Sequence, residues 1–544
     1  MGLLKIKLYG SIIGLQVLIK TNQNLEGSLL IKLPFYFYIL ILITIGTSVL
    51  FFFYNLEDLS VSYDNFFKQS IKFTFFQAIL STSISITFGF ILSLCLYLSN
   101  IKSHYITTAL NFFFIAPVLF ISYGVIFIHG SNGLMQKIFQ LFNLDFSYSF
   151  FGLVGIIYVT SFFNIALSAN YFYRKLINIP ENYLKLLTAN KINFYLALTK
   201  YLRPIILNNF IILVSMILIF CISNFTIIYI FANSPLLTTI ELAIYQKISF
   251  EANILDAVVY GFIQSGLIII ILIPILKLKN NFELLTLKQS EIYRIYKPNL
   301  LSGIILIIFC FYFFTPCLVI LKGLLNFNLD LLFSLGSLTA FMYSFLIAIS
   351  SLFISLLIGL SSLFITRGLY EKKSQLSNFI IFTIFIISFI PAITLSAILF
   401  LINSNLNFIL PNFLIVSFVN SFLLTPLIFL FLLPKFMENN KHERLKIIQF
   451  KISPLVRLIK IDFLKFKKEL LIICSSCFVL SMGDLTSITL FNSNSFKTVP
   501  YLISQLYSSY RYDDAFFILA VFVIFIVFFL YSINRVLYKN VGIK

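Results

Sequence analysis

Twelve apolar stretches, each about long enough to cross a bilayer as a helix, constrain this 544-residue chain more than any other feature. They lie near residues 34–54, 71–99, 106–129, 150–173, 205–232, 257–276, 300–321, 338–366, 378–402, 412–434, 470–491 and 515–533. The chain is 60% hydrophobic and 11% charged, and a soluble protein has too little polar surface to cover so much apolar material. We therefore predict an all-α polytopic membrane protein with about 12 transmembrane helices.

The distribution of basic residues predicts the orientation of these helices. If residue 1 lies in the cytoplasm and the stretches alternate, only seven of the 39 Lys and Arg fall on the outer side: Lys68, Lys72, Lys137, Lys247, Lys322, Lys497 and Arg511. Cytoplasmic loops of membrane proteins are enriched in Lys and Arg. The net charge of +19 is thus a topology signal with some attraction for anionic lipid, and it does not indicate a nucleic-acid partner. Both termini are predicted to be cytoplasmic.

No catalytic or metal-binding motif stands out. All six cysteines lie in apolar stretches, and Cys474 and Cys477 are better explained as small membrane residues than as a redox dithiol. The three histidines are far apart and lack metal-ligand spacing. No phosphate-binding glycine-rich loop of the G-x-x-x-x-G-K-[ST] type is present, so we expect no enzyme activity, no metal and no cofactor in this chain.

The two halves of the sequence match each other. With a shift of 260 residues, Asn224 pairs with Asp484 and Thr238 with Thr498; with a shift of 256, Asn164 pairs with Asn420. Six stretches per half give both copies the same orientation, as in a parallel repeat that encloses a central path. We predict a cytoplasmic or interfacial N-terminal segment (1–33), a first permease unit (34–276), a cytoplasmic linker (277–299), a second unit (300–535) and a cytoplasmic tail (536–544).

Two long basic loops, 174–204 and 435–468, occupy equivalent places on the cytoplasmic side of the two halves. In the first, Leu184, Leu187, Phe194 and Leu198 form an apolar stripe with helical spacing. Such a stripe suits docking on a partner protein, whereas the alternative is a pair of helices lying on the membrane surface.

Asp484 interrupts the apolar stretch 470–491 and follows Gly483. A carboxylate within a span is costly and usually faces a cavity or a polar partner. Asp484 therefore either lines a substrate path or pairs with a Ser or Asn of a neighbouring helix and holds the two halves together.

Four stretches closely resemble the permeases of thiamine and thiamine pyrophosphate ABC transporters: 116–135, 152–167, 238–257 and 480–515. The resemblance extends over roughly residues 34–540 and includes the fused two-half plan. It implies the architecture of a type I ABC importer permease in a bacterial inner membrane. It also implies three partners, namely the lipid bilayer, a periplasmic substrate-binding protein, and a cytoplasmic ATPase dimer that carries the ATP and Mg²⁺.

The basic loops resemble the coupling loops of such permeases, although their motif is degraded. In the first loop Lys185 stands at the motif glutamate, Lys191 at its glycine and Pro204 at its proline; in the second, Lys451 and Leu464 stand at the glycine and the proline. The residues that the resemblance assigns to ATPase coupling are Lys185, Lys191, Asn193, Pro204, Glu443, Lys451, Ser453, Pro454, Arg457 and Leu464.

The resemblance also assigns a substrate path and an outer docking surface. The candidate path residues are Asn164, Asn224, Asn420, Gly483 and Asp484. The candidate docking residues for the binding protein are Thr238, Glu241, Tyr245, Gln246, Thr498, Tyr501 and Gln505. A pathway carboxylate would compensate the positive thiazolium of thiamine, with help from aromatic side chains.

Three alternatives stay open. A fused ferric-iron permease has the same plan, but outer loops rich in Tyr and His are not evident. A cation-coupled secondary transporter would need several midplane carboxylates on broken helices. A membrane-embedded enzyme would need a reactive cluster.

Overall fold

The computed structural model of this chain describes residues 65–276, 300–371, 390–405, 411–437 and 449–539. Short gaps fall at 100, 102, 132, 144–149, 193–195, 208–209, 451, 453–455 and 494, and residues 32–36, 39 and 384 are also described. Within these ranges every regular element is a helix, which confirms the all-α prediction.

The first half contains thirteen of these elements. They are α2 (Asn65–Leu98), α3 (Ser103–Ile115), α4 (Val118–His129), α5 (Leu134–Leu141), α6 (Leu153–Ile177), α7 (Glu181–Ala189), η1 (Ala197–Leu202), α9 (Arg203–Ile206), α10 (Phe210–Ile222), α11 (Phe225–Phe231), η2 (Pro235–Leu237), α12 (Ile240–Ser249) and α13 (Ile254–Leu276).

The second half repeats much of this order. Its elements are α14 (Leu300–Phe314), η3 (Thr315–Cys317), α15 (Leu318–Leu325), α16 (Leu329–Leu332), α17 (Leu335–Glu371), α19 (Ala392–Asn405), α20 (Asn412–Met437), η4 (Arg457–Asp462), α23 (Phe463–Lys465), α24 (Lys467–Met482), α25 (Ile488–Phe491), α26 (Val499–Ser508) and α27 (Tyr512–Lys539).

In the described part of the chain, eight helices are long and apolar enough to cross a membrane, and a bent pair, Ala197–Ile206 with Phe210–Ile222, makes a ninth. The chain is thus a multi-pass membrane protein. The predicted stretch 34–54 and most of 378–402 lie outside the described residues, and α24 has only 16 residues. The number twelve therefore stays a prediction.

Small residues let the long helices approach closely. A Cβ atom added at Gly89 of α2 would lie only 1.7 Å from the Ser168 hydroxyl of α6. That hydroxyl instead donates a 2.6 Å hydrogen bond to the Ser85 carbonyl of α2. In the second half, α17 and α20 are joined by the 2.7 Å bond from Ser350 to Ser417. Close packing and hydroxyl bonds are what join helices where no water is available.

The two halves share unusual local geometry at equivalent positions. The π-helices η1 and η4 begin 260 residues apart, at Ala197 and Arg457, and a short α-helix follows each of them. A π-helix is rare, and the occurrence of two π-helices 260 residues apart supports the internal duplication.

A second hydrogen bond recurs in both halves and joins α12 to α2 in the first half and α26 to α17 in the second. The backbone N–H of Ile240 in α12 bonds the Thr74 hydroxyl of α2 at 3.0 Å, and that of Val499 in α26 bonds the Ser344 hydroxyl of α17 at 2.8 Å. In the second half the donor is Val499 and not Pro500, which is the counterpart of Ile240, because proline has no backbone N–H.

Helices of the two halves pack directly against each other. Helix α14, the first of the second half, packs on α2 of the first half, and α12 packs on α19 and α25. Tyr312 of α14 donates a 3.0 Å hydrogen bond to the Tyr158 carbonyl of α6. The two halves therefore share one interface through the middle of the molecule.

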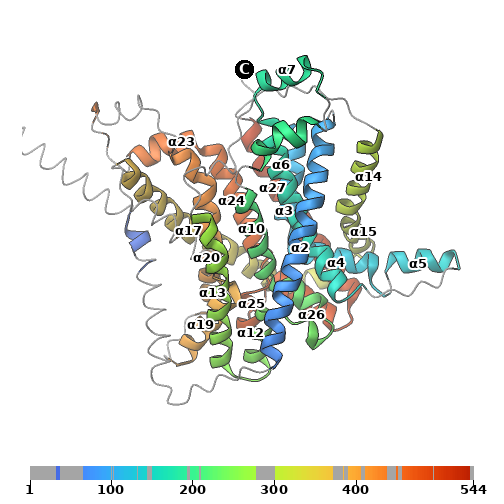
Figure 1. Ribbon diagram of the computed structural model, residues 1–544. Coiled ribbons are helices and arrows are strands. Elements are labelled where there is room, and N and C mark those ends of the chain that lie inside the picture. Colours follow the sequence, from blue (N-terminus) through green and yellow to red (C-terminus); the bar gives the residue numbers. More distant parts are fainter. Residues whose placement is uncertain are drawn as a thin grey trace, which may run out of the picture.

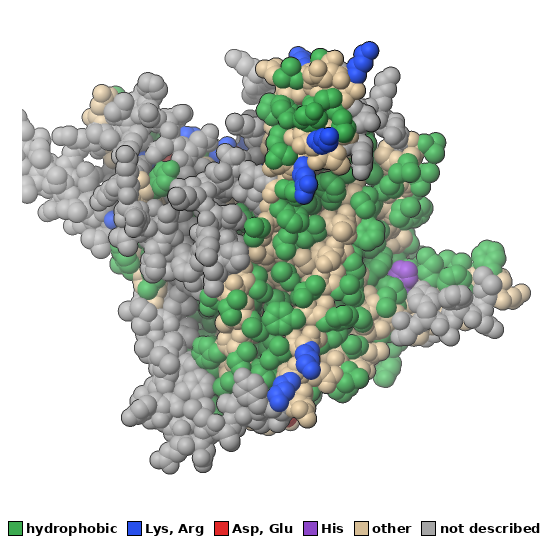
Figure 2. Space-filling model, viewed as in Figure 1, with side chains coloured by type: hydrophobic (Ala, Val, Ile, Leu, Met, Phe, Trp, Pro, Cys, Tyr) green, Lys and Arg blue, Asp and Glu red, His purple; other side chains and the backbone are tan. Residues whose placement is uncertain are grey.

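The ends of the molecule differ from its middle. Helix α7 lies at one end, and α12, α25 and α26 gather toward the other (Figure 1). Between them hydrophobic side chains dominate the visible surface, while Lys and Arg gather over the end with α7 and at a few places near the opposite end (Figure 2). This pattern is that of an apolar belt between two polar ends.

Candidate functional site

A cavity of about 340 Å³ lies between the two halves. Its walls come from α3, α6, α10 and α12 of the first half and from α19, α20 and α24 of the second. All five residues assigned to the substrate path from the sequence line it: Asn164, Asn224, Asn420, Gly483 and Asp484. Four of these are polar side chains that the repeat places at equivalent positions in the two halves.

Asp484 caps the short turn that leads into α25. Its carboxylate accepts hydrogen bonds from the N–H of Thr486 at 3.1 Å, the N–H of Ser487 at 3.2 Å and the hydroxyl of Ser487 at 2.6 Å. Its counterpart Asn224 caps α11 in the same way and accepts from the N–H of Ile227 at 3.4 Å. Both residues thus satisfy free backbone donors where a helix begins after a break.

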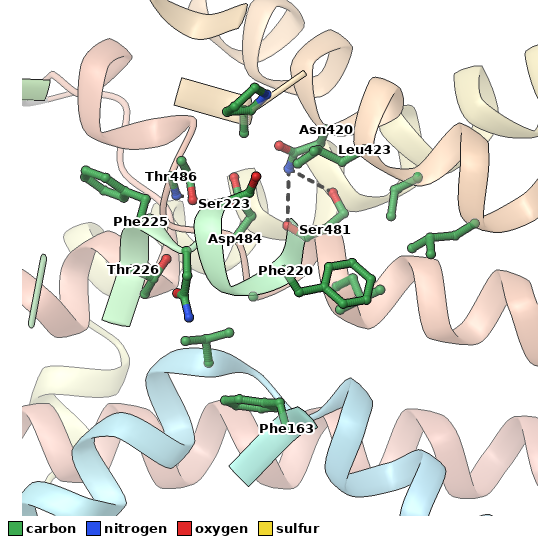
Figure 3. Close-up of a pocket in the computed structure, with 18 of the residues that line it drawn as sticks. Phe163, Phe220, Ser223, Phe225, Thr226, Asn420, Leu423, Ser481, Asp484 and Thr486 are labelled. Atoms are coloured by element: carbon green, nitrogen blue, oxygen red, sulfur yellow. Dashed lines mark hydrogen bonds between the residues drawn. The ribbon is translucent and has the colours of Figure 1, made fainter. Parts of the chain in front are cut away.

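A chain of polar contacts links this cap to the neighbouring long helices. The Ser487 hydroxyl lies 2.6 Å from the Asn420 carbonyl oxygen, and the Asn420 amide donates to the Ser481 hydroxyl at 3.1 Å (Figure 3). Ser481 in turn contacts Ser351 of α17 at 2.7 Å. All these residues belong to the second half, so the contacts of Asp484 fix its own half and do not hold the two halves together.

In the first half, different side chains provide the polar part of the cavity wall. Asn164 of α6 donates to the Thr160 carbonyl at 3.0 Å and to the Cys221 sulfur at 3.3 Å. Ser223, the counterpart of Gly483, also lines the cavity, and its buried hydroxyl has no hydrogen-bond partner among the described residues.

Glu241 is a member of the cavity wall, which the sequence did not predict. Its side chain is only 2% exposed, and the Gln264 amide donates to it at 3.4 Å. Burial raises the pKa of Glu241 to about 8, the nearby Asp484 acts in the same direction, and the Gln264 bond partly opposes the shift.

The rest of the wall is largely apolar. Four phenylalanines contribute to it: Phe114, Phe163, Phe220 and Phe225. Figure 3 shows Asp484, Thr486 and Ser481 on one side of the space and Phe163 on the other. An apolar, aromatic space with a few fixed polar groups is typical of a small-molecule site, and its volume lies near the lower end of the usual range of about 300–1,000 Å³.

The first predicted coupling loop forms a raised helix, α7, at the end of the molecule opposite α12 (Figure 1). The predicted stripe does not face outward there, since Leu184 and Leu187 are 3% and 4% exposed and pack into the chain itself. The exposed surface is made instead by Lys185, which pairs with Glu181 at 2.7 Å, and by Leu186, which is 61% exposed.

Lys191, at the place of the motif glycine, has a positive φ of 53°. This left-handed conformation is the one that favours glycine, so the backbone keeps the shape that the motif encodes although the side chain has changed. Pro204 follows in α9 and is exposed, while Asn193 lies outside the described residues.

The second coupling loop is described in part. Arg457 begins η4 and is partly buried, and Leu464 in α23 is 68% exposed. Glu443, Lys451, Ser453 and Pro454 lie outside the described residues.

A buried ion pair attaches this second loop to the membrane helices. Asp462 of η4 lies 2.8 Å from Arg367 of α17, and both side chains are less than one-tenth exposed. The guanidinium of Arg367 also lies 5.0 Å from the centre of the Phe436 ring. The equivalent hydroxyls of Thr74 and Ser344 align α2 with α17 at a shift of 270 residues, so Arg367 corresponds to Tyr97, while Asp462 corresponds to Leu202 at the shift of 260. Both counterparts are buried and neither carries a charge, so the ion pair has no equivalent at these two described positions.

The predicted docking residues differ in how far they are exposed to solvent. Gln505 is exposed, and Tyr245, Gln246 and Tyr501 are half-buried. Thr238, Glu241 and Thr498 are at most 4% exposed, so these three side chains contribute no accessible surface in this structure, and their assignment to docking stays a prediction. Their sequence lies between spans, but α12 and α26 pack inward against the long helices.

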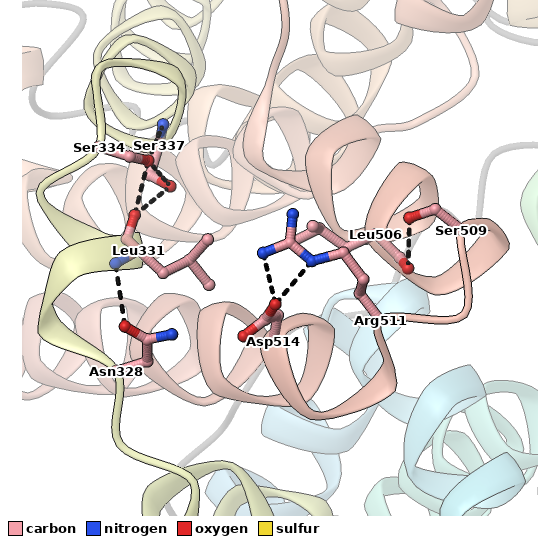
Figure 4. A network of polar contacts seen from close by, with 8 residues as sticks. All are labelled: Asn328, Leu331, Ser334, Ser337, Leu506, Ser509, Arg511 and Asp514. Carbon is pink, nitrogen blue, oxygen red and sulfur yellow. Dashed lines mark hydrogen bonds and ion pairs between the residues drawn. The ribbon is translucent and has the colours of Figure 1, made fainter.

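The end of the molecule that holds α26 also carries a polar network in the second half (Figure 4). Asn328 caps α16 by accepting from the Leu331 N–H at 3.1 Å, and Arg511 donates to Asp514 at 2.7 Å. Lys322 of α15 pairs with Asp513 of α27 at 3.1 Å, which joins the loops at this end. The network stiffens the part of the surface next to the exposed Gln505.

No family model matches the chain, but curated relatives do. A thiamine transport system permease protein of Haemophilus influenzae is 28% identical over 464 residues, which cover 83% of this chain and 85% of that protein. The protein of the same name from Brucella abortus is 25% identical over 475 residues, covering 84% and 86%. That of Escherichia coli is 22% identical over 467 residues, covering 83% and 85%.

These matches extend over both halves and confirm the resemblance that four stretches of the sequence indicate. They agree with the helical, multi-pass architecture. The chain is therefore similar to the thiamine transport system permease proteins over more than four-fifths of its length.

Proposed function

We propose that this chain is the membrane-spanning permease subunit of an ABC importer that moves thiamine or thiamine pyrophosphate into the cell. The observation that carries the proposal is the match to thiamine transport permeases over more than four-fifths of both chains. The cavity between the halves, with its two carboxylates, supports a positively charged cargo.

The domain division forms part of this proposal. We assign residues 34–276 and 300–535 to two parallel permease units, with 1–33, the linker 277–299 and the tail 536–544 in the cytoplasm of a bacterium and the spans in its inner membrane. The recurrence of the π-turn and of the helix caps at the repeat spacing supports this division. The ferric-iron alternative is not favoured, because the relatives that match more than four-fifths of the chain are named for thiamine.

The energy comes from a separate ATPase dimer, which holds ATP and Mg²⁺, and this chain supplies transport without hydrolysis of its own. Helix α7 and the segment around η4 receive the movement of the ATPase, and the opposite end receives a substrate-loaded binding protein. The exposed Leu186 and Leu464 suit contact with a partner, since large apolar side chains exposed at a polar end are typical of docking surfaces.

The test is ATPase stimulation in the reconstituted complex. The permease, its ATPase and its binding protein are assembled in liposomes, and the binding protein is loaded with thiamine, thiamine pyrophosphate or ferric iron. We expect a thiamine form to stimulate hydrolysis and to appear inside the vesicles. Stimulation by iron alone would leave the architecture intact and refute the cargo.

A further inference from the structure

Two carboxylates are the only ionisable side chains among the described residues that line the central cavity. Glu241 comes from α12 in the first half, and Asp484 comes from the loop before α25 in the second. No basic side chain among these lining residues offsets them. A buried negative charge is costly unless it is compensated, so a cation that enters the cavity would stabilise the ionised form of both carboxyl groups, including Glu241, whose pKa burial raises.

Both carboxylates are held in place before any ligand arrives. Asp484 accepts three hydrogen bonds from Thr486 and Ser487, and Glu241 accepts one from Gln264, whose own side chain is fully buried. Side chains fixed in this way lose little conformational freedom when a ligand binds. The buried hydroxyl of Ser223, without a partner among the described residues, adds a polar group to the same space.

The two carboxylates stand on different halves of the molecule. Helix α12 packs on α25, so the segment with Glu241 meets the segment that Asp484 caps across the interface. The repeat gives each residue a neutral counterpart, since Asn224 corresponds to Asp484 and Tyr501 to Glu241. The charge is therefore divided between the halves, one carboxylate from each.

We propose that Glu241 and Asp484 together bind the positive charge of the transported substrate and that this cation site exists only while the two halves are closed on each other. The ligand class is an aromatic organic cation, because Phe163, Phe220 and Phe225 face the same space and aromatic faces attract cations. The inference rests on the proposed function for the identity of the cargo. When the halves separate, each carboxylate moves with its own half. The site then loses its affinity for the substrate cation.

The proposal assigns to Glu241 a role that its position between two spans did not indicate. It also explains why the chain keeps two buried acids without basic neighbours. A single carboxylate would bind a cation whether the halves were open or closed, whereas a divided pair makes release a consequence of the movement itself.

The experiment measures ligand binding to the purified permease–ATPase complex in the absence of the binding protein. The probes are thiamine and thiochrome, the uncharged oxidised derivative of thiamine. The variants are Glu241→Gln and Asp484→Asn, which keep the shape of each side chain and remove its charge. The controls are Glu251→Gln and Asp513→Asn, which remove exposed carboxylates outside the cavity.

We expect each cavity variant to weaken thiamine binding by about tenfold or more, while thiochrome binding changes less than about twofold. The controls should bind both probes as the unmodified complex does. Equal loss of both probes would show that the two residues only support the fold and would overturn the proposal.

Unchanged thiamine binding in both cavity variants would overturn it as well. Failure of the proposed function gives a different result, because no thiamine form would then stimulate ATP hydrolysis by the unmodified complex with its binding protein. Size-exclusion profiles and thermal unfolding of each variant establish that the complexes compared are folded.

Discussion

At the scale of single residues, Asp484 and Asn224 show how one local structure can serve two purposes. Asn224 caps α11, whereas Asp484 accepts from the turn that precedes α25, and each accepts the N–H three residues later. Asparagine and aspartate accept such bonds about equally well. The bond to the Ser487 N–H therefore does not require a charge, although Asp484 also accepts from Thr486 through its second oxygen.

This equivalence predicts different results for two substitutions of Asp484. Asp484→Asn should lower the thermal unfolding midpoint less than Asp484→Ala does, because the single amide oxygen can still accept from the N–H of Ser487 or from that of Thr486, although not from both. Asp484→Ala should cost about 1 kcal/mol, the usual price of a lost cap. Thermal unfolding of the purified variants measures both effects, and an equal loss of stability in the two would contradict the assignment.

The raised pKa of Glu241 predicts a pH dependence of stability. The folded protein holds the proton up to about pH 8, whereas the ordinary value is 4.5, so the folded state binds more protons than the unfolded state between these limits. Stability conferred by this group is therefore present at low pH and is lost as the pH rises through that window.

Glu241→Gln should flatten this dependence. The measurement compares the thermal midpoints of the unmodified protein and the variant at pH values across the window. Equal slopes for the two proteins would show that Glu241 does not hold its proton there.

At the scale of elements, the two coupling segments have similar backbones but different anchors. The π-turns η1 and η4 are equivalent, yet only η4 is tied to a long helix by the Asp462–Arg367 pair. Removing one partner of a buried ion pair leaves the other charge uncompensated, which usually costs about 3–5 kcal/mol.

The first half offers a replacement for this pair. Asp462→Asn should lower the thermal midpoint strongly, whereas the double variant Arg367→Tyr with Asp462→Leu, which introduces the residues of the first half, should recover much of the loss. A double-mutant cycle gives the coupling energy. Additive effects of the two substitutions would show that the pair does not act as a unit.

Lys191 provides a second prediction at this scale. A residue with a side chain at φ of 53° is strained, and glycine is not. Lys191→Gly should therefore raise stability by up to about 1 kcal/mol, and Lys191→Val should lower it. Denaturation of both variants checks the direction, and a destabilising glycine would refute the correspondence with the motif.

At the scale of the whole molecule, the proposed transport cycle requires movement to pass from the coupling segments to the central interface. Reversing the charge at Lys451 and Arg457 should uncouple transport from ATP hydrolysis without unfolding the permease, since both stand in the segment that precedes the anchored Asp462. The readouts are uptake, ATPase rate and retention of the ATPase subunit. Normal uptake with a firmly bound ATPase would contradict the role of this segment.

The sequence predicts the architecture of this molecule better than it predicts the site. Apolar stretches and the repeat are properties of long segments, so they indicate the helices and bring Asn164, Asn224, Asn420, Gly483 and Asp484 to one cavity. Glu241 is different, because a residue between two spans is expected at the surface. The packing of α12 against α13, α19 and α25 turns its side chain inward, and no local sequence pattern encodes these contacts.

The shared cap has a consequence for how such a permease can change its cargo. Codons for aspartate and asparagine differ by a single base, so one mutation at Asn224 or Asp484 alters the charge of the cavity wall. Because both amino acids can accept the backbone N–H three residues later, such a mutation keeps that bond. We infer that selection can change the charge of one half while this local hydrogen bond is retained.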